Sequence, residues 1–322
     1  MSASENKQQM LHLAGKLGIP VSEFDKEFHF LQLNEIHIVD MLPEMLVMVR
    51  SLVADKTFSY KRKPIDAVEK GLMFSFQNII NLPMSEKTQE EKPLQARPHV
   101  RITPLDLESE VLFTKGINIT QITILIELNY LKNFIGNSQN KFGYLFNDEK
   151  TFFIEEFMSP EMAEVVNEIA DTSSVAILPE AYYKLKVLQL LYLLFKNLSE
   201  RQDMTHQSLR GDEIEAVYRV RDRIALSLDH PLQQNELVAI SGMNSLKLRK
   251  LFTQVFGKGI YEYYQHLRMQ EAARLIQQEH LSVSEAGYQL GFSNLSYFGR
   301  LFEKHFGLKP KKWSAQYRLN KT

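Results

Sequence analysis

The pattern of apolar and polar residues changes along the chain from strand-like to helical. Before residue 158, segments rich in β-branched or aromatic residues, several of which alternate with polar ones, lie at 35–39, 45–52, 71–76 and 119–126. Such segments are typical of β-strands, and the alternation indicates that one face of the strand is buried. A polar stretch without periodicity, residues 83–98, is predicted to be a long exposed loop. The pattern therefore predicts an antiparallel β-sandwich or barrel over residues 1–158.

Helical spacing begins at residue 159. Ser159 and Pro160 form a good helix start, with the serine as N-cap and the proline in the first turn. A second helix is predicted over residues 179–201, and its centre is apolar on nearly every side. A helix half-exposed on a monomer would avoid that pattern, so this helix is expected either to contact a second subunit or to be fully buried within its own domain. The polar residues that follow, 199–212, are predicted to be a linker.

The rest of the chain is helical in pattern and contains an approximate repeat with a spacing of 50 residues. The segment KLFTQVFG at 250–257 aligns with RLFEKHFG at 300–307. Each copy predicts a short helix, a tight turn and a longer helix: 236–240, 241–244 and 245–256 in the first copy, and 283–290, 291–293 and 294–306 in the second. Asn244 and Ser293 are predicted as N-caps of the longer helices, and Gly257 and Gly307 as the residues that end them.

The two longer helices each have an apolar face and a polar face. The apolar faces, predicted to be core, carry Leu248, Phe252, Val255 and Phe256 in the first copy and Phe298, Leu301, Phe302 and Phe306 in the second. The opposite faces carry Leu246, Lys247, Arg249 and Lys250, and then Leu295, Ser296, Gly299, Arg300 and Glu303. Arginine or lysine on such a helix can contact guanine O6 and N7 in the major groove of DNA.

The helix predicted between the two copies has the right length to bridge two grooves. Residues 260–279 would span roughly 30 Å at 1.5 Å per residue. Successive major grooves on one face of DNA lie roughly 34 Å apart. The pattern therefore predicts one polypeptide that reads two adjacent grooves with two helix-turn-helix units.

Charge supports a polyanionic partner for the C-terminal part. The net charge of the whole chain is −1, but residues 241–322 hold 13 Lys and Arg against 5 Asp and Glu. Residues 1–210 hold 28 acidic and 22 basic residues, so the chain joins an acidic part to a basic one. There is no cysteine, which excludes disulfides and thiolate zinc sites. The N-terminus lacks a signal-peptide pattern and no apolar run is long enough to span a bilayer, so we expect a cytoplasmic protein without a membrane partner.

The front of the chain offers little for catalysis. A metal site in a β-barrel enzyme needs three or four ligands that converge, whereas His29 and His37 lie eight residues apart and His99 stands alone. No phosphate-binding loop or nucleophile motif is present. We therefore expect no catalytic residues, no metal and no cofactor. A β-barrel metalloenzyme fused to a DNA-binding domain is the alternative from another functional class.

The segment SVSEAGYQLGFSNLSYFGRLFEKHFGLKP at 282–310 resembles the signature of the AraC family of bacterial transcription regulators. The resemblance extends over about residues 214–318 and implies a seven-helix DNA-binding domain with two recognition helices. It places base contacts or phosphate contacts on Leu246, Lys247, Arg249, Lys250, Asn294, Leu295, Ser296, Gly299, Arg300 and Lys304. Of these, Lys247, Lys304 and the helix starts are the expected phosphate contacts. The first unit matches the signature less closely than the second.

The resemblance also implies an overall organisation. The expected chain is an α+β multidomain protein. It has a cupin-like β-domain for regulation at 1–158 with a helical hairpin, a helical dimerisation or interdomain segment at 159–205, and a double helix-turn-helix domain at 212–322. The expected function is sequence-specific regulation of transcription, without enzymatic activity. The expected partners are double-stranded DNA and a second copy of the chain. A small-molecule effector or a protein partner would act on the front domain, and RNA polymerase is a further candidate partner.

Overall fold

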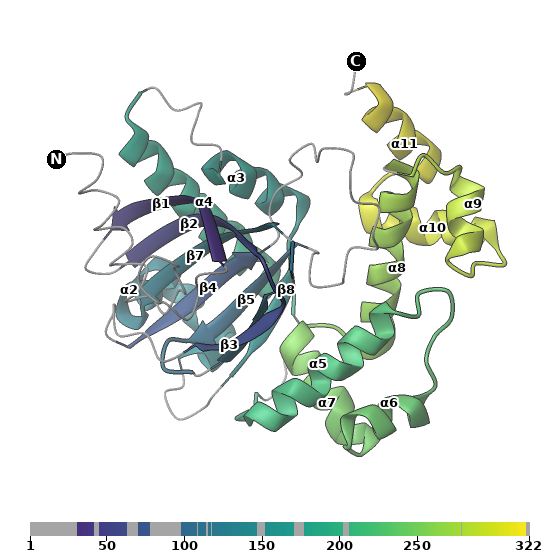
Figure 1. The fold of residues 1–322 in the computed structure, drawn as a ribbon, viewed down its shortest axis with the longest axis horizontal. Helices are drawn as coiled ribbons and strands as arrows, with labels where there is room; N and C mark the ends of the chain where they lie inside the picture. Colours follow the sequence, from purple (N-terminus) through teal and green to yellow (C-terminus); the bar gives the residue numbers. More distant parts are fainter. Residues whose placement is uncertain are drawn as a thin grey trace. The chain divides into compact units, whose positions relative to one another are not determined.

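The structure is a computed structural model, which divides into two compact units, Met1–Gly211 and Asp212–Thr322 (Figure 1). It describes residues 31–41, 45–62, 70–77, 98–107, 109–113, 115–116, 118–146, 152–170, 177–201, 206–277 and 279–319. Most of the predicted exposed loop at 83–98 lies outside the described residues.

The N-terminal unit is built on an antiparallel sheet of six strands. Their order is β1 (Leu31–Met41), β2 (Met45–Ala54), β7 (Asn118–Glu127), β4 (Gly71–Gln77), β5 (His99–Pro104) and β8 (Ile154–Phe157). Strands β3 (Phe58–Arg62) and β6 (Ser109–Phe113) form a separate antiparallel pair. Antiparallel strands are confirmed, but within the described residues the six-stranded sheet is not closed. The cupin-like barrel therefore stays a prediction.

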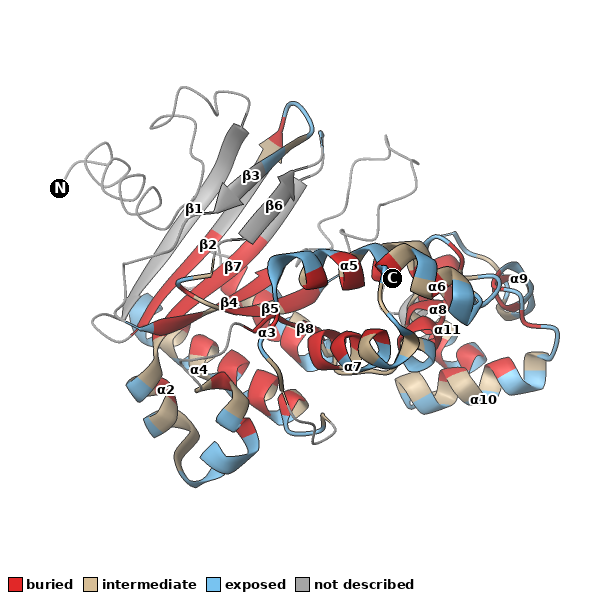
Figure 2. Cartoon of the chain, turned by 90° about the horizontal axis from the view of Figure 1, so that it is seen from below, coloured by how far each residue is buried: buried red, intermediate tan, exposed pale blue. Residues whose placement is uncertain are grey.

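One face of this sheet carries the core of the unit. Because side chains alternate between the faces of a strand, Leu72, Phe74 and Phe76 of β4 point to the same side. They join a buried cluster with residues of α3 (Pro160–Ala170) and α4 (Pro179–Leu198), and Figure 2 shows buried residues on both the strands and these helices. The ring of Phe195 on α4 lies 6.1 Å from that of Phe74 and 5.0 Å from that of Phe142. The two helices therefore form a second layer on one side of the sheet.

The start of α3 agrees with the sequence prediction, whereas one alternative for α4 does not. The Ser159 hydroxyl accepts a hydrogen bond from the Met162 amide at 3.2 Å, and the helix begins at Pro160. On α4, Leu185 and Tyr192 are 68% and 63% exposed within the chain. The alternative of a helix fully buried within its own domain is therefore wrong.

A helical segment interrupts the strands of the predicted β-region. Helix α2 (Leu128–Ile135) directly follows β7, and the 3-10 segment η3 (Gly136–Leu145) directly follows α2. The Glu127 carboxylate accepts a hydrogen bond from the Tyr130 amide at 2.8 Å, which caps α2 at its N-terminus. The sequence pattern predicts a β-rich region over 1–158 and no helix at this place, because the strand-like run at 119–126 continues directly into the residues that form α2.

The C-terminal unit consists of seven helices over its described residues, as the family resemblance implied. They are α5 (Gly211–Ala225), α6 (Gln234–Ser241), α7 (Ser245–Phe256), α8 (Ile260–Gln277), α9 (Val283–Gln289), α10 (Leu295–Phe306) and α11 (Pro310–Leu319). Figure 1 shows α8 running between the pair α6–α7 and the pair α9–α10. Throughout the described part of the chain, the helices are too short or too polar to span a bilayer.

The helix ends of the repeat follow the predicted chemistry with one shift. Asn244 caps α7 by accepting a hydrogen bond from the Lys247 amide at 2.9 Å. The cap of α10 is Asn294, which accepts from the Tyr297 amide at 3.0 Å, so the prediction of Ser293 as cap is wrong by one residue. Gly257 and Gly307 end the two helices with φ of 69° and 72°, which glycine adopts without strain.

Candidate nucleic-acid interface

The first helix-turn-helix unit is α6, its turn and α7. Gly242 ends α6 with φ of 66°, and the Ser241 hydroxyl accepts a hydrogen bond from the Met243 amide in the turn at 3.2 Å. The predicted apolar face of α7 is buried, and Phe252 contacts Phe256 and Tyr263 at ring distances of 4.6 and 5.3 Å. Because this face is fixed in the core, the opposite face of α7 must point away from it.

That opposite face presents apolar and cationic side chains. Leu246 is 79% exposed, and Arg249 and Lys250 are exposed. The Lys247 ammonium lies 2.7 Å from a carboxylate oxygen of Glu213, whose side chain is nearly buried on α5. The Arg249 guanidinium donates to the Gln234 amide oxygen at 2.6 Å. Two of the predicted DNA contacts are thus held by neighbouring helices, and a DNA phosphate would compete with Glu213 for Lys247.

The second unit, α9 to α10, is anchored by a capping box at its start. The Ser282 hydroxyl accepts from the Glu285 amide at 3.2 Å, and the Glu285 carboxylate accepts from the Ser282 amide at 2.8 Å. Hydrogen bonding of the Glu285 carboxylate to the Ser282 side chain, and then to the Ser282 backbone amide, lowers the pKa of this carboxyl. On the core side of α10, Phe298 and Phe302 are fully buried, and Leu301 and Phe306 pack more loosely on the same cluster. The list of core residues predicted from the repeat is confirmed.

The outward face of α10 is open. Ser296, Arg300 and Lys304 are exposed, and a Cβ placed on Gly299 would meet no atom within 4 Å. Leu295 differs, because its Cδ2 lies only 2.8 Å from where a Cβ on Gly287 would stand. The Leu295 side chain is therefore partly occupied in packing α10 on α9.

His305 on α10 does not add to the positive surface. The rings of His266 and His305 lie 4.5 Å apart. Burial, and then the charge of Lys258, lower the pKa of His305 to about 4. The ring is therefore neutral near pH 7, and the cationic character of α10 comes from Arg300 and Lys304.

The sequence did not reveal the side chains that contact the two cations of α7, Lys247 and Arg249. Glu213 and Gln234 lie on α5 and α6, 34 and 15 residues before the cations that they contact. Both residues read as ordinary solvated polar positions. Only the packing of α5 and α6 beside α7 brings Glu213 and Gln234 to these cations, so no local pattern could have found them.

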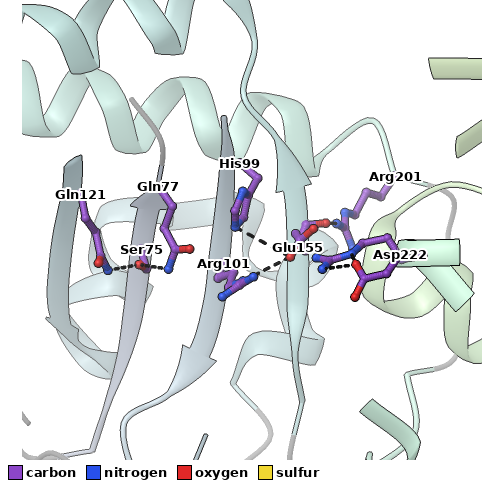
Figure 3. Close-up of polar contacts among 9 residues, drawn as sticks. Ser75, Gln77, His99, Arg101, Gln121, Glu155, Arg201 and Asp222 are labelled. Atoms are coloured by element: carbon purple, nitrogen blue, oxygen red, sulfur yellow. Dashed lines mark hydrogen bonds and ion pairs between the residues drawn. The ribbon is translucent and has the colours of Figure 1, made fainter. Parts of the chain in front are cut away.

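The N-terminal unit has a polar cluster on the sheet face away from α3 and α4 (Figure 3). Gln77 donates to the Ser75 hydroxyl at 3.0 Å, and Gln121 donates to the same hydroxyl and to Thr123 at 3.1 Å. Further along the row, the Arg101 guanidinium lies 3.2 Å from a carboxylate oxygen of Glu155. The buried members of this polar face are Ser75, His99, Thr103, Gln121, Thr123 and Glu155.

Within the described residues, no group of three or more His, Asp or Glu is arranged to hold a metal ion. His29 lies outside the described residues, and nothing is described of the His37 side chain. His99 lies 3.9 Å from Glu155 in the polar face.

Comparisons with known proteins concern the C-terminal unit. A helix-turn-helix domain family matches residues 237–316. The chain is 29% identical over 100 residues to the HTH-type transcriptional regulator GlxA of Rhizobium meliloti, a match that covers 31% of each protein. It is 33% identical over 92 residues to the probable transcription factor PqrA of Proteus vulgaris, which covers 27% of this chain and 75% of PqrA. The chain thus spans about a third of GlxA and three quarters of PqrA.

A solved structure gives a further match. The crystal structure of a probable AraC family transcriptional regulator from Rhodopseudomonas palustris is 28% identical. The match covers 32% of this chain and 97% of that one, with a TM-score of 0.30.

Proposed function

The chain belongs to the AraC family of DNA-binding transcription regulators, and we propose that α7 and α10 bind adjacent major grooves of one DNA site. The observation that carries this proposal is the pair of outward faces on α7 and α10, which belong to two helix-turn-helix units joined by α8. Helix α8 has 18 residues, or roughly 27 Å at 1.5 Å per residue. That length is comparable with the roughly 34 Å between successive major grooves.

The exposed residues suggest separate roles in binding. Arg249, Lys250 and Arg300 would read bases, because arginine and lysine match the acceptors of guanine. Leu246 would contact a thymine methyl, and Ser296 and Leu295 would lie beside the bases. Lys247, Lys304 and the helix start at Asn294 would bind phosphates, with Lys247 leaving Glu213 to do so. Gly299 would let the backbone of α10 approach the DNA closely.

A footprint of the full chain on the promoter regions next to its own gene tests the proposal. Two protected major-groove segments about one helical turn apart for each copy are expected. Protection of one segment alone would contradict reading by both units. Binding that is equal on all sequences and lost with added salt would leave only phosphate contacts.

Arg300→Ala is expected to weaken binding to the protected site by about 1–3 kcal/mol and to relax preference at the matching base. Arg300 is exposed on α10 and its removal leaves the core of the unit untouched. Competition binding with site variants measures both effects. Lys304→Ala is the matched control on the same helix, and it should weaken binding to all DNA sequences alike. Equal losses on specific and random DNA for Arg300→Ala would assign that residue to a phosphate.

The N-terminal unit is proposed to regulate DNA binding in response to a small polar ligand. Its support is the polar face of Ser75, Gln121, Arg101 and Glu155, since a few placed polar groups orient small ligands. A protein partner that docks on this unit is the other candidate signal, and RNA polymerase is a candidate partner at promoters. The protein would act in the cytoplasm, where bacterial DNA lies. Stronger binding by residues 211–322 alone than by the full chain would support regulation by the front unit.

A homodimer is proposed to form through the outward face of α4. Ala181, Leu185, Leu188 and Tyr192 follow one another at intervals of four, three and four residues. Ala181, Leu185 and Tyr192 are exposed and Leu188 is half-buried. This spacing is that of the apolar seam of a coiled coil, which needs a second helix with the same pattern. A second copy of α4 meets that need.

The charges of α4 favour an antiparallel pair. Glu180 lies in the first turn and Lys196 in the last. In an antiparallel pair centred between Leu188 and Gln189, Leu185 of one copy would face Tyr192 of the other, and Glu180 would lie close to Lys196. A parallel pair would instead place like charges together at both ends.

Leu185→Glu is therefore expected to convert a dimer into a monomer, because it places a charge within the apolar seam. Sedimentation equilibrium of the full chain measures the change. Asn167→Glu on the exposed side of α3 adds the same charge to the same unit and should leave the dimer intact. A wild-type chain that is monomeric throughout, or a dimer unaffected by Leu185→Glu, would contradict the proposed interface.

A further inference from the structure

The two helix-turn-helix units are joined by more than the helix that links them in sequence. The loop between α5 and α6, residues 226–233, precedes the first unit, yet its Leu228 packs on the core cluster of the second unit. The Tyr264 hydroxyl on α8 donates to the Leu228 carbonyl oxygen at 3.3 Å. This loop is therefore held both by α8 and by the second unit.

The next residue of that loop contacts the turn of the second unit directly. A Cβ placed on Gly291 would stand 1.8 Å from the Asp229 carbonyl oxygen, and Gly291 has φ of 73°. Only glycine permits both that backbone angle and so close an approach of two backbones. The turn after α9 and the loop before α6 are thus in backbone contact.

Arg268 of α8 lies at this junction and is 6% exposed. Its guanidinium stacks on the Phe292 ring at 3.6 Å and lies 5.0 Å from the ring of Tyr264. It donates to the Leu290 carbonyl oxygen at the C-terminal end of α9 and to the Gln265 amide oxygen at 3.3 Å. Burial lowers the pKa of the guanidinium, with the nearby Tyr264 opposing that shift. One buried side chain therefore holds both ends of the turn from Leu290 to Phe292 against α8.

We propose that Arg268 is a positioning residue that fixes the distance between α7 and α10, and with it the spacing of the two half-sites that the chain accepts on DNA. Without further contacts, the second helix-turn-helix unit could pivot about the end of α8. The Arg268 contacts and the backbone contact between Gly291 and Asp229 remove that freedom. The consequence for DNA rests on the proposed function, whereas the fixed distance does not.

A measurement of the distance between the two helix-turn-helix units tests, without DNA, whether that distance is fixed. The chain has no cysteine, so Ala239→Cys on α6 and Ser284→Cys on α9 give two unique labelling sites. Both positions are exposed and neither is among the proposed DNA contacts. Pulsed electron paramagnetic resonance of nitroxide labels on the full chain is expected to give a narrow distance distribution. Arg268→Met should broaden it, because methionine keeps the packing of the stem but makes neither the stacking contact nor the hydrogen bonds.

Two further variants separate positioning from general damage. Arg274→Met is the matched control: Arg274 on the same helix forms ion pairs with Glu271 and Glu279, and its substitution should leave the width of the distribution unchanged. Tyr264→Phe removes the hydroxyl that donates to the Leu228 carbonyl oxygen and should broaden the distribution even if Arg268→Met fails to fold. An unchanged width in a folded Arg268→Met chain and in Tyr264→Phe would overturn the proposal. A wild-type distribution as broad as that of the variants would do the same.

The consequence on DNA is tested with the site found by the footprint. Inserting about five base pairs, half a helical turn, between its two protected segments turns one half-site to the other side of the duplex. The wild-type chain is expected to lose on the order of tenfold or more in affinity, as for a mismatched site. Arg268→Met should bind the original site less tightly but lose several-fold less on insertion. Equal losses for the two proteins would overturn the proposal, whereas a wild type that protects one segment alone would contradict the two-groove function and leave the distance result standing.

Discussion

Phe302→Ala is expected to lower the free energy of unfolding of the C-terminal unit by about 3–5 kcal/mol, the usual cost of truncating a buried phenylalanine. Phe302 is fully buried, and its ring lies 5.9 Å from that of Phe298, 4.6 Å from that of Phe306 and 5.4 Å from that of Trp313. The cavity would open where α10 meets α8 and α11. Because a small domain is marginally stable, a loss of this size removes most of its stability and its DNA binding with it.

The repeat supplies a matched partner for this test. Phe252 occupies the same place in the first copy, is fully buried and contacts Phe256 and Tyr263. Phe252→Ala should therefore cost a similar free energy. Urea unfolding followed by the fluorescence of Trp313, the single tryptophan of the chain, measures both. Leu246→Ala, on the exposed side of α7, should change stability by less than about 0.5 kcal/mol. A loss below about 1 kcal/mol for either phenylalanine would mean that the core collapses around the gap.

The repeat is also the reason that the C-terminal fold could be predicted so fully. Apolar residues at helical spacing recur 50 residues apart, and local chemistry marks the ends of each helix. Asn244 and the two terminating glycines act where the sequence placed them. The second cap was misplaced because Ser293 and Asn294 are adjacent and both are good capping residues, so only backbone geometry distinguishes them.

The contacts between distant segments could not be predicted in this way. The ion pair of Lys247 with Glu213, the stacking of Arg268 on Phe292 and the approach of Asp229 to Gly291 all depend on how helices pack. A buried arginine in an amphipathic helix has no signature in the sequence that separates it from a solvated one. The position of the proposed DNA contacts is thus a matter of local pattern, whereas the distance between them is a matter of tertiary packing.

Within the N-terminal unit, the short segment at 128–145 shows the same limit. Helix α2 has a single fully buried residue, Leu131, and its cap is a glutamate that ends the preceding strand. Eight residues are too few for helical periodicity to stand out beside a ten-residue strand. The helix was therefore missed, although the preceding strand at 119–126 was identified correctly; strand β8 (Ile154–Phe157), which follows the helical segment, was not predicted either.

The second large effect is expected at the end of α4. The Arg201 guanidinium lies 2.8 Å from a carboxylate oxygen of Glu156 on β8 and donates to the Glu155 carbonyl oxygen at 2.7 Å. Figure 3 shows Arg201 beside the strand that carries Glu155. The two paired side chains are only 9% and 11% exposed. Arg201→Met would leave the Glu156 carboxylate buried without this cation, at a cost of about 3–5 kcal/mol.

The double variant distinguishes loss of the pair from loss of packing. In Arg201→Met with Glu156→Gln no charge remains to be buried, so most of the lost stability should return. Urea unfolding followed by far-ultraviolet circular dichroism gives the free energies, and hydrogen exchange of the β8 peptides shows whether the loss begins at this strand. Glu156→Gln alone completes the double-mutant cycle. It should lower the free energy of unfolding less than Arg201→Met does, because the Arg201 guanidinium keeps the Glu155 carbonyl and a neutral amide as acceptors. If the double variant were no more stable than Arg201→Met, the arginine would act through the packing of its stem and the pair would contribute little.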